Sequence, residues 1–243
     1  FAAYRERRLA GELYVPGQRK QVSPTTINRE LLYLQAVFNE LGRLGEWAHG
    51  NPLEVLRQYK VQESELAFLN QDEIEQLLAA CVGLNDLWLI VMLCLSTGAR
   101  WSEIEKLTRS QVGIGRLTFT RTKGKKNRTV PVAGWLLALL PKRTGRLFGD
   151  CYAEFEKALR RAGITLPAGQ RTHVLRHSFA SHFMMGGGNI LVLQRILGHT
   201  DIKMTMRYAH FAPDHLEDAV NLNPITAMIN GGKVAAALTS DTQ

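Results

Sequence analysis

The chain has 243 residues, 45% of them hydrophobic, so it can bury at least one complete core and should be a globular protein. Thirty Lys and Arg residues against 22 Asp and Glu residues give a net charge of +8, which favours a polyanionic partner such as nucleic acid or an anionic membrane surface. The longest apolar run, residues 87–95, is about half of what a bilayer crossing needs, and no signal peptide opens the chain, so we expect a soluble protein. The three cysteines form neither a disulfide set nor a metal motif, which indicates a reducing cytosol.

The N-terminal region has helical patterns. Residues 1–13 show one at the very start, so we expect the sequence to be part of a longer protein. Residues 24–45 repeat apolar side chains at three- and four-residue spacing and predict an amphipathic helix, with Thr25 or Thr26 as its N-cap. A polar connector of mixed charge follows at 57–66.

This connector predicts a domain boundary near residue 63. We therefore expect a partial helical domain over 1–62 and a second domain over 63–243. The second domain ends in a tail, 221–243, in which a small apolar segment follows a Gly-Gly hinge.

The second domain changes from helices to a hairpin and back. Asn70 is the expected N-cap of its first helix, and residues 86–97 predict a buried helix. A short helix is expected over 101–112, and residues 115–133 alternate apolar and polar side chains around the basic turn KGKKN, which predicts a β-hairpin. Helical patterns return over 134–141, 150–162, 173–185, 189–197 and 201–209. The predicted fold class is mainly α with a small antiparallel β-sheet.

The hairpin carries the highest density of positive charge in the chain. Five cations and no acid lie between residues 121 and 128: Arg121, Lys123, Lys125, Lys126 and Arg128. One interpretation is a solvated strand edge whose charges prevent sheet aggregation. The other is contact with DNA phosphates, which the absence of compensating acids favours.

A second group of candidate residues lies in the segment THVLRHSFASHF. His173 and Arg176 are three positions apart, so on a helix they share a face and can hold one anion between them. His177, four positions after His173, raises the alternative of a zinc pair, but the segment lacks the HExxH pattern and a nearby third ligand. For His177 and His182 an interior imidazole with satisfied nitrogens remains open.

Arg100 follows the predicted buried helix. An arginine that emerges from a buried element needs an anionic partner, either an internal carboxylate or a ligand phosphate. Glu103 is the nearest carboxylate along the chain, so both roles stay open.

Taken together, four segments resemble the tyrosine recombinase family, the integrases that cut and rejoin DNA. They are TGARWSEI, TKGKKNRTVPV, THVLRHSFASHFM and LGHTDIKMTMRYAH, and they span residues 97–210. The likeness is closest to integrases of temperate phages and prophages, of the P2-like group. The part of the chain before residue 63 resembles the end of the family's helical core-binding domain.

The resemblance assigns roles to individual residues. It implies a catalytic set of Arg100, Lys123, His173, Arg176, His199 and Tyr208, with Tyr208 as nucleophile and Lys123 as the acid for the leaving oxygen. Glu103 corresponds to the family's supporting carboxylate. The remaining hairpin cations, Arg121, Lys125, Lys126 and Arg128, are expected to bind DNA.

The implied function is that of a site-specific DNA recombinase. It cuts and rejoins strands through a 3′-phosphotyrosyl intermediate, needs no metal ion, cofactor or ATP, and integrates or excises phage or mobile-element DNA. Expected partners are double-stranded attachment sites, further copies in a ring of four that the tail helps to join, and accessory DNA-bending proteins, in the cytoplasm of a bacterial host. The alternatives are a DNA-binding protein of the same fold without catalysis and an enzyme like the type IB topoisomerases.

Overall fold

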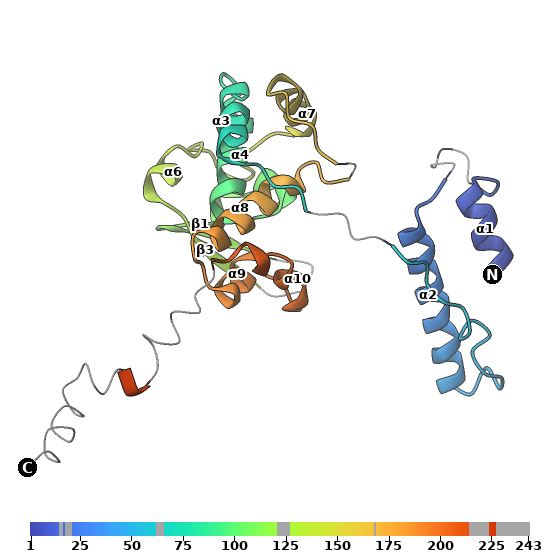
Figure 1. Cartoon of the computed structure of the whole chain (residues 1–243). Coiled ribbons are helices and arrows are strands. Elements are labelled where there is room, and N and C mark those ends of the chain that lie inside the picture. Colours follow the sequence, from blue (N-terminus) through green and yellow to red (C-terminus); the bar gives the residue numbers. More distant parts are fainter. Residues whose placement is uncertain are drawn as a thin grey trace, which may run out of the picture. The chain divides into compact units, whose positions relative to one another are not determined.

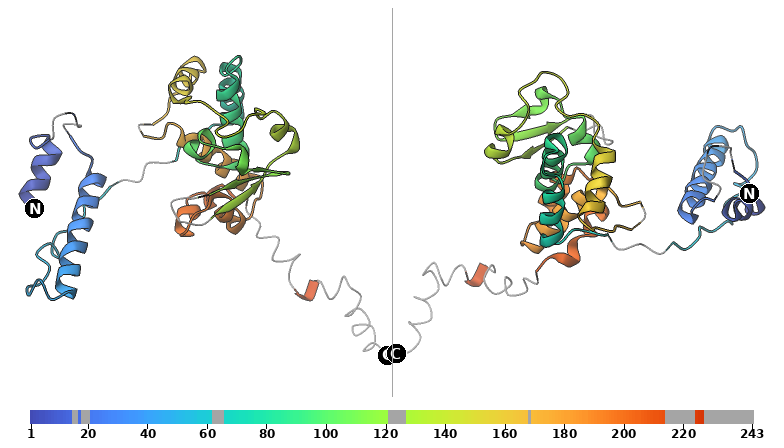
Figure 2. Two further views of the ribbon diagram at one scale, coloured as in Figure 1. Left: turned by 180° about the vertical axis from the view of Figure 1, so that it is seen from behind. Right: turned by 90° about the horizontal axis from the view of Figure 1, so that it is seen from above.

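The computed structural model describes residues 1–14, 17, 21–61, 66–120, 127–167, 169–213 and 224–226. The chain divides into two compact units, Phe1–Glu65 and Leu66–Gln243, whose elements Figures 1 and 2 show. Within the described part of the chain, no helix combines the length and apolar character that a membrane span needs. Four of the five hairpin cations (Arg121, Lys123, Lys125 and Lys126) and nearly all of the tail 221–243 lie outside the described residues.

The first unit contains helices α1 (Ala2–Ala10) and α2 (Pro24–Arg43). Helix α2 begins at residue 24 as predicted, but Thr25 and Thr26 were the wrong caps. The N-cap is Ser23, which accepts the backbone N–H of Thr26, and Pro24 fits the first helical position. The amide of Asn28 binds the backbone of Tyr59 twice, donating to its carbonyl at 2.9 Å and accepting its N–H at 2.8 Å. This pair fastens the end of the unit to α2.

The second unit begins with three helices in sequence. Helix α3 (Gln71–Ala80) has the predicted cap at Asn70, completed by Glu73 in a capping box. Helix α4 (Asn85–Thr97) is almost wholly apolar and runs through the core beside α8 (His173–Met185). Helix α5 (Trp101–Glu105) is shorter than the 101–112 helix that we expected, and a 3-10 turn, η1 (Arg109–Gln111), follows it.

The sheet is small and antiparallel, as predicted. Its strands β1 (Val112–Gly113), β2 (Arg116–Phe119) and β3 (Arg128–Pro131) lie in chain order. The β2–β3 register pairs Leu117 with Val130 and Phe119 with Arg128, so these four residues share the buried face.

The remaining helices follow the predicted order. Helix α8 has the predicted bounds, and the others are shorter than expected: α6 (Gly134–Ala138), α7 (Tyr152–Arg161), α9 (Ile190–Leu197) and α10 (Lys203–Met206). The single helix expected over 201–209 is absent. Because Tyr208 donates its backbone N–H to the carbonyl of Thr205, three residues earlier, the helix tightens and gives way to the 3-10 turn η2 (Ala209–Phe211).

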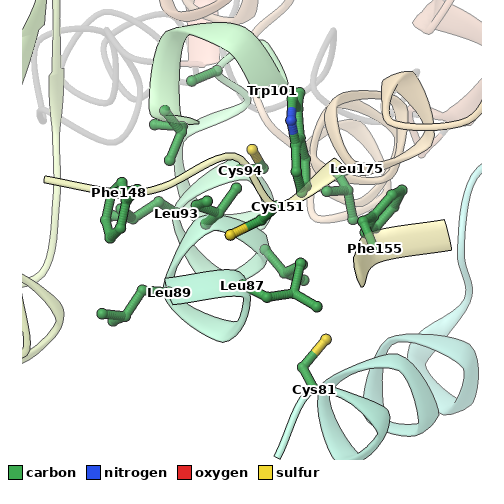
Figure 3. Close-up of a cluster of buried hydrophobic side chains, with 14 of the residues drawn as sticks. Cys81, Leu87, Leu89, Leu93, Cys94, Trp101, Phe148, Cys151, Phe155 and Leu175 are labelled. Carbon is green, nitrogen blue, oxygen red and sulfur yellow. The ribbon is translucent and has the colours of Figure 1, made fainter. Parts of the chain in front are cut away.

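The hydrophobic core of this unit has two parts. The larger one surrounds α4 and includes the buried thiols of Cys81, Cys94 and Cys151, which pack as small apolar groups among leucine and phenylalanine side chains (Figure 3). The smaller one joins α8 and α9 to the segment after α10, and Tyr208 is one of its buried members. The second core therefore buries the candidate nucleophile.

Candidate active site

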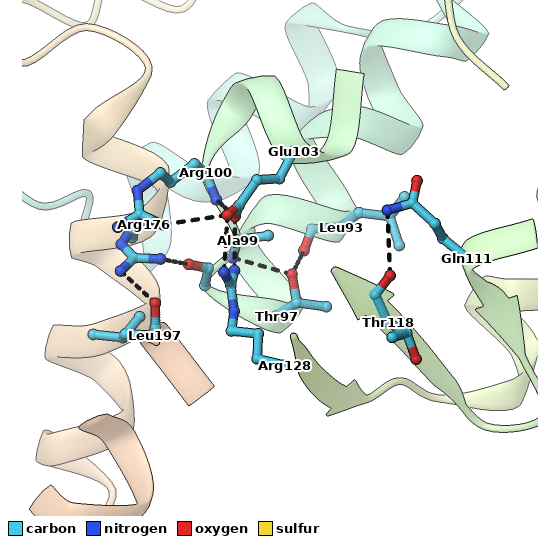
Figure 4. A network of polar contacts seen from close by, with 11 residues as sticks. Leu93, Thr97, Ala99, Arg100, Glu103, Gln111, Thr118, Arg128, Arg176 and Leu197 are labelled. Atoms are coloured by element: carbon cyan, nitrogen blue, oxygen red, sulfur yellow. Dashed lines mark hydrogen bonds and ion pairs between the residues drawn. The ribbon is translucent and has the colours of Figure 1, made fainter. Parts of the chain in front are cut away.

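Arg176 ties together two helix ends that are far apart in the sequence. It lies on α8 with only 5% of its surface exposed. One terminal nitrogen donates to the carbonyl of Gly98 at 2.8 Å, and the other donates to the carbonyl of Leu197 at 2.7 Å (Figure 4). Since Arg100 and His199 each follow one of these carbonyls by two residues, Arg176 brings both of them to its own neighbourhood.

Two glycines make this convergence sterically feasible. Gly98 ends α4 with φ +63°, and a Cβ there would lie 2.4 Å from the ring of Phe179. Gly198 ends α9 with φ +67°, and a Cβ there would lie 2.9 Å from Cδ of Arg128. Both positions need the left-handed backbone and the missing side chain of glycine.

Glu103 holds the arginines beside this junction. Its carboxylate accepts the backbone N–H of Arg100 at 2.8 Å and the Arg100 guanidinium at 3.2 Å. Both terminal nitrogens of Arg128 also donate to it, at 2.8 and 2.7 Å (Figure 4). Burial disfavours the charge, but the bonds and charges of Arg128 and Arg100 outweigh it and keep the pKa of Glu103 below its usual value.

The expectation that Arg128 binds DNA beside the other hairpin cations is wrong for this arrangement. Its side chain is 7% exposed, lies with its guanidinium carbon 4.6 Å from the centre of the Phe119 ring, and donates both terminal nitrogens to Glu103. The reason is the strand register, which places Arg128 opposite Phe119 on the buried face. Arg128 therefore supports the site from inside.

For Arg100, the internal carboxylate is confirmed as a partner, and contact with a ligand phosphate stays a prediction. Arg100 pairs with Glu103, yet 28% of its side chain remains exposed, so it keeps surface for an external anion. Burial, followed by the charges of Arg100 and Arg128, lowers the pKa of Arg176 to about 9. The junction is thus a buried accumulation of positive charge that Glu103 offsets only in part, and an approaching anion would stabilise it.

His199 lies just beyond this junction. A hydrogen bond of 2.9 Å links its Nδ1 to the hydroxyl of Thr205, a fully buried residue of α10. Burial, followed by the charges of Arg176 and Arg100, lowers the pKa of His199 to about 4, so the ring is neutral at neutral pH. With Nδ1 engaged by Thr205, Nε2 is the ring nitrogen that a ligand can use.

Tyr208 is buried, with 2% of its surface exposed. Its hydroxyl oxygen lies 2.6 Å from Nδ1 of His177 on α8. Burial raises the pKa of Tyr208, and the charges of Arg176 and Arg207 oppose that rise. His177 is half-buried, and the partner of its Nδ1 is the candidate nucleophile, which lies 31 positions away and which no local spacing could indicate.

The other histidines of α8 have different surroundings. His173 is exposed at the start of the helix, and its ring centre lies 6.3 Å from that of His177. His182 donates from Nε2 to the carbonyl of Leu69 at 2.8 Å, as an interior histidine does. No group of three or more His, Cys, Asp or Glu residues that could hold a metal ion occurs in the described ranges.

The structure thus brings Arg100, Glu103, Arg176 and His199 near enough to influence one another electrostatically, and α8 carries His173, Arg176 and His177 along one segment beside Tyr208. Lys123, the remaining catalytic candidate, lies outside the described residues, and its role stays a prediction.

Known proteins share this sequence and fold. Residues 67–147 and 148–215 match the family described as "Phage integrase family", and residues 1–60 match "Phage integrase, N-terminal domain". The chain is 60% identical over 233 residues to the integrase of Escherichia phage 186, covering 95% of this chain and 69% of that protein. It is 43% identical over 215 residues to the integrase of Escherichia phage P2, covering 87% of this chain and 63% of that protein.

A solved structure of a phage integrase domain is also similar to this chain. The catalytic domain of bacteriophage HP1 integrase is 64% identical, with a TM-score of 0.65, and the match covers 67% of this chain and 98% of that domain. The chain spans about two thirds of the length of the 186 and P2 integrases.

Proposed function

The chain belongs to the phage integrase family, and we propose that it cuts and rejoins DNA with Tyr208 as nucleophile and with the residues around Arg176 as the phosphate site. The resemblance drawn from the four sequence segments, including the likeness to the P2-like group, is confirmed. The chain is a site-specific recombinase of the tyrosine class that acts in phage DNA integration.

The observation that carries the proposal is the pair of bonds from Arg176 to the carbonyls of Gly98 and Leu197. These bonds use two of the five N–H groups of the guanidinium, which leaves donors for the oxygens of a phosphodiester. Arg100, with exposed surface beside it, and neutral His199 supply further donors. Together they form a preorganised clamp for the negative charge that develops as a nucleophile attacks phosphorus.

In the proposed reaction the oxygen of Tyr208 attacks the phosphorus and displaces the 5′-oxygen of the next nucleotide. A 3′-phosphotyrosyl bond forms and a free 5′-hydroxyl remains, so rejoining by another 5′-hydroxyl needs no ATP. The leaving oxygen is a strong base and requires a proton, for which we retain Lys123 as the donor.

Because Tyr208 is buried, we infer that the described arrangement is a resting state and that binding to DNA exposes the phenol. The short helix α10 and its turn are the elements that would shift. The same proposal includes attachment sites as substrates and accessory DNA-bending proteins as partners. It also includes an assembly of four copies on synapsed DNA, joined through 221–243, and a bacterial cytoplasm as the place of action.

Footprinting first maps the attachment sequence. The test is then cleavage of a nicked duplex that carries this sequence. The nick lets the short cleaved strand diffuse away and traps the covalent complex. We expect a protein–DNA adduct that survives denaturation with the unaltered chain and is lost in Tyr208→Phe, while DNA binding by a mobility shift stays the same. An adduct that persists in Tyr208→Phe would contradict the assignment.

A further inference from the structure

The contact between His177 and Tyr208 has no role in the phosphate clamp. Nδ1 of His177 lies 2.6 Å from the hydroxyl oxygen of Tyr208, and the two ring centres are 6.0 Å apart. The phenol packs in the small core with Ala180, Met184, Leu193 and Leu197, which keeps bulk water from it. In the described part of the chain, the atom placed to exchange a proton with the nucleophile is therefore Nδ1 of His177.

We propose that His177 is the base that removes the proton of Tyr208 as the phenol attacks phosphorus. The inference rests on the proposed function. In the forward step the O–H bond of Tyr208 breaks, its proton moves to Nδ1 of His177, the new O–P bond forms, and the 5′-oxygen leaves with a proton from the proposed acid, Lys123. On rejoining, the imidazolium returns its proton to the departing phenolate, so the cycle balances without any added reactant.

The charges around His177 explain why the base acts only when DNA is present. Burial, followed by the charges of His173, Arg207 and Arg176, lowers the pKa of His177 to about 4, so without DNA the ring is neutral and a weak base. His173 and Arg176 face it from α8, Arg207 and Tyr208 from the segment after α10, and His199 from the turn after α9.

A bound phosphodiester changes this balance. Its negative charge, held by Arg176, offsets the same cations that disfavour the imidazolium, so the basicity of His177 rises when the substrate arrives. The phenol stays protonated and unreactive in the resting protein and loses its proton at the scissile phosphate. This coupling confines nucleophile activation to the DNA complex.

The decisive variant is His177→Asn, because the asparagine amide reaches nearly the position of Nδ1 and keeps a hydrogen bond to Tyr208 but cannot take up a proton. We expect unchanged DNA binding and single-turnover cleavage of the nicked duplex slower by about 10²–10⁴-fold near neutral pH. Cleavage by the variant should rise about tenfold per pH unit, because hydroxide must then form the phenolate. The unaltered chain should show a much flatter profile over the same range.

Replacing Tyr208 in both backgrounds by 3-fluorotyrosine, whose phenol is more acidic, separates a base from a packing residue. The fluorinated phenol should restore cleavage in His177→Asn far more than it changes the parent. His182→Asn is the matched control, since His182 lies on the same helix but bonds to the carbonyl of Leu69, and it should keep the parental pH profile.

Cleavage by His177→Asn at the parental rate would overturn the proposal, as would a loss that neither high pH nor the fluorinated phenol relieves. If His177→Asn does not fold, as judged by its thermal transition, His177→Ala assayed with added imidazole gives the same decision: restoration supports the base, and its absence excludes it. Failure of the proposed function itself looks different, because then the unaltered chain forms no adduct.

Discussion

Arg176 is held by two backbone carbonyls from distant helix ends, whereas Tyr208 is held by one side-chain bond to His177 and by a helix of four residues. Moving Arg176 requires the ends of α4 and α9 to move with it. Moving Tyr208 with α10 requires the loss of the bond between His199 and Thr205, and for the proposed proton transfer the hydroxyl of Tyr208 must stay within reach of Nδ1 of His177. The comparison supports our proposal of a phosphate clamp that is formed before DNA binds and a nucleophile segment that adjusts afterwards.

This difference suits the chemistry. Donors that stabilise a transition state act best when they need no rearrangement during the reaction. A nucleophile that could reach any passing phosphodiester would cut DNA outside its target, so its burial favours control. We therefore expect the clamp to be rigid and the segment 203–211 to adjust.

The largest effect is expected at Arg176. Arg176→Ala leaves the carbonyls of Gly98 and Leu197 buried without their donor, at a cost of ~1–3 kcal/mol for each group. We expect no detectable adduct on the nicked duplex and a free energy of unfolding lower by about 2–5 kcal/mol, as measured by urea denaturation.

Arg100→Ala is the matched comparison. Its side chain is 28% exposed and makes one ion pair, so we expect cleavage lower by about 10²–10³-fold but a stability change within about 1 kcal/mol. DNA binding should persist in both variants, since other phosphate contacts remain. Equal destabilisation by the two substitutions would remove the distinction between a structural and an exposed arginine.

The next effect concerns the nucleophile segment. Thr205→Val keeps the shape of the side chain but removes the hydroxyl that bonds to His199. We expect cleavage lower by about tenfold, because His199 loses its orientation, together with faster amide hydrogen exchange over 203–211. Thr200→Val, at an exposed position in the turn between α9 and α10, should change neither the cleavage rate nor the hydrogen exchange. Unchanged exchange in Thr205→Val would show that this bond does not restrain the segment.

The hairpin gives a smaller effect, on binding alone. Lys125 and Lys126 lie outside the described residues, and the sequence predicts that they contact DNA phosphates. Replacing both by alanine should weaken binding to any duplex and reduce the slope of log affinity against log salt by about 2. Arg128→Ala should instead lower stability, because it leaves Glu103 without its main partner. A salt slope unchanged by the double variant would mean that these lysines do not contact DNA.

The smallest effect is in the pH dependence of stability. Since the pKa of Glu103 is lowered in the folded protein, its charge stabilises the fold above the usual value of 4.5, and this contribution is lost as pH falls through the lower folded value. We expect Glu103→Gln to show a weaker loss of melting temperature between about pH 5 and pH 3 than the parent. Parallel curves for the two proteins would contradict this account of the carboxylate.

Local signals in the sequence predicted much of the fold. Asn70 was correctly expected as a cap because a capping box depends on residues three apart, and the hairpin because alternation and a basic turn are also local. The cap at Ser23 was missed although Pro24 marks the first helical position. The register opposite Phe119 places the side chain of Arg128 on the buried face of the sheet. The positive charge of the neighbouring residues suggested DNA contact instead.

The site was only partly accessible from the sequence. The resemblance supplied the residue types, and the structure places Arg100, Arg176 and His199 together. The two carbonyls that position Arg176 carry no side-chain signature, and the pairing of His177 with Tyr208 arises from the packing of α8 against η2. Such contacts depend on tertiary packing, which cannot be predicted from residue spacing in a single sequence.

The most direct measurement is mass spectrometry of the adduct trapped on the nicked duplex. After digestion of protein and DNA, the account predicts a nucleotide joined through its 3′-phosphate to the peptide that contains Tyr208. A nucleotide on any other residue, or one joined through its 5′-phosphate, would contradict it.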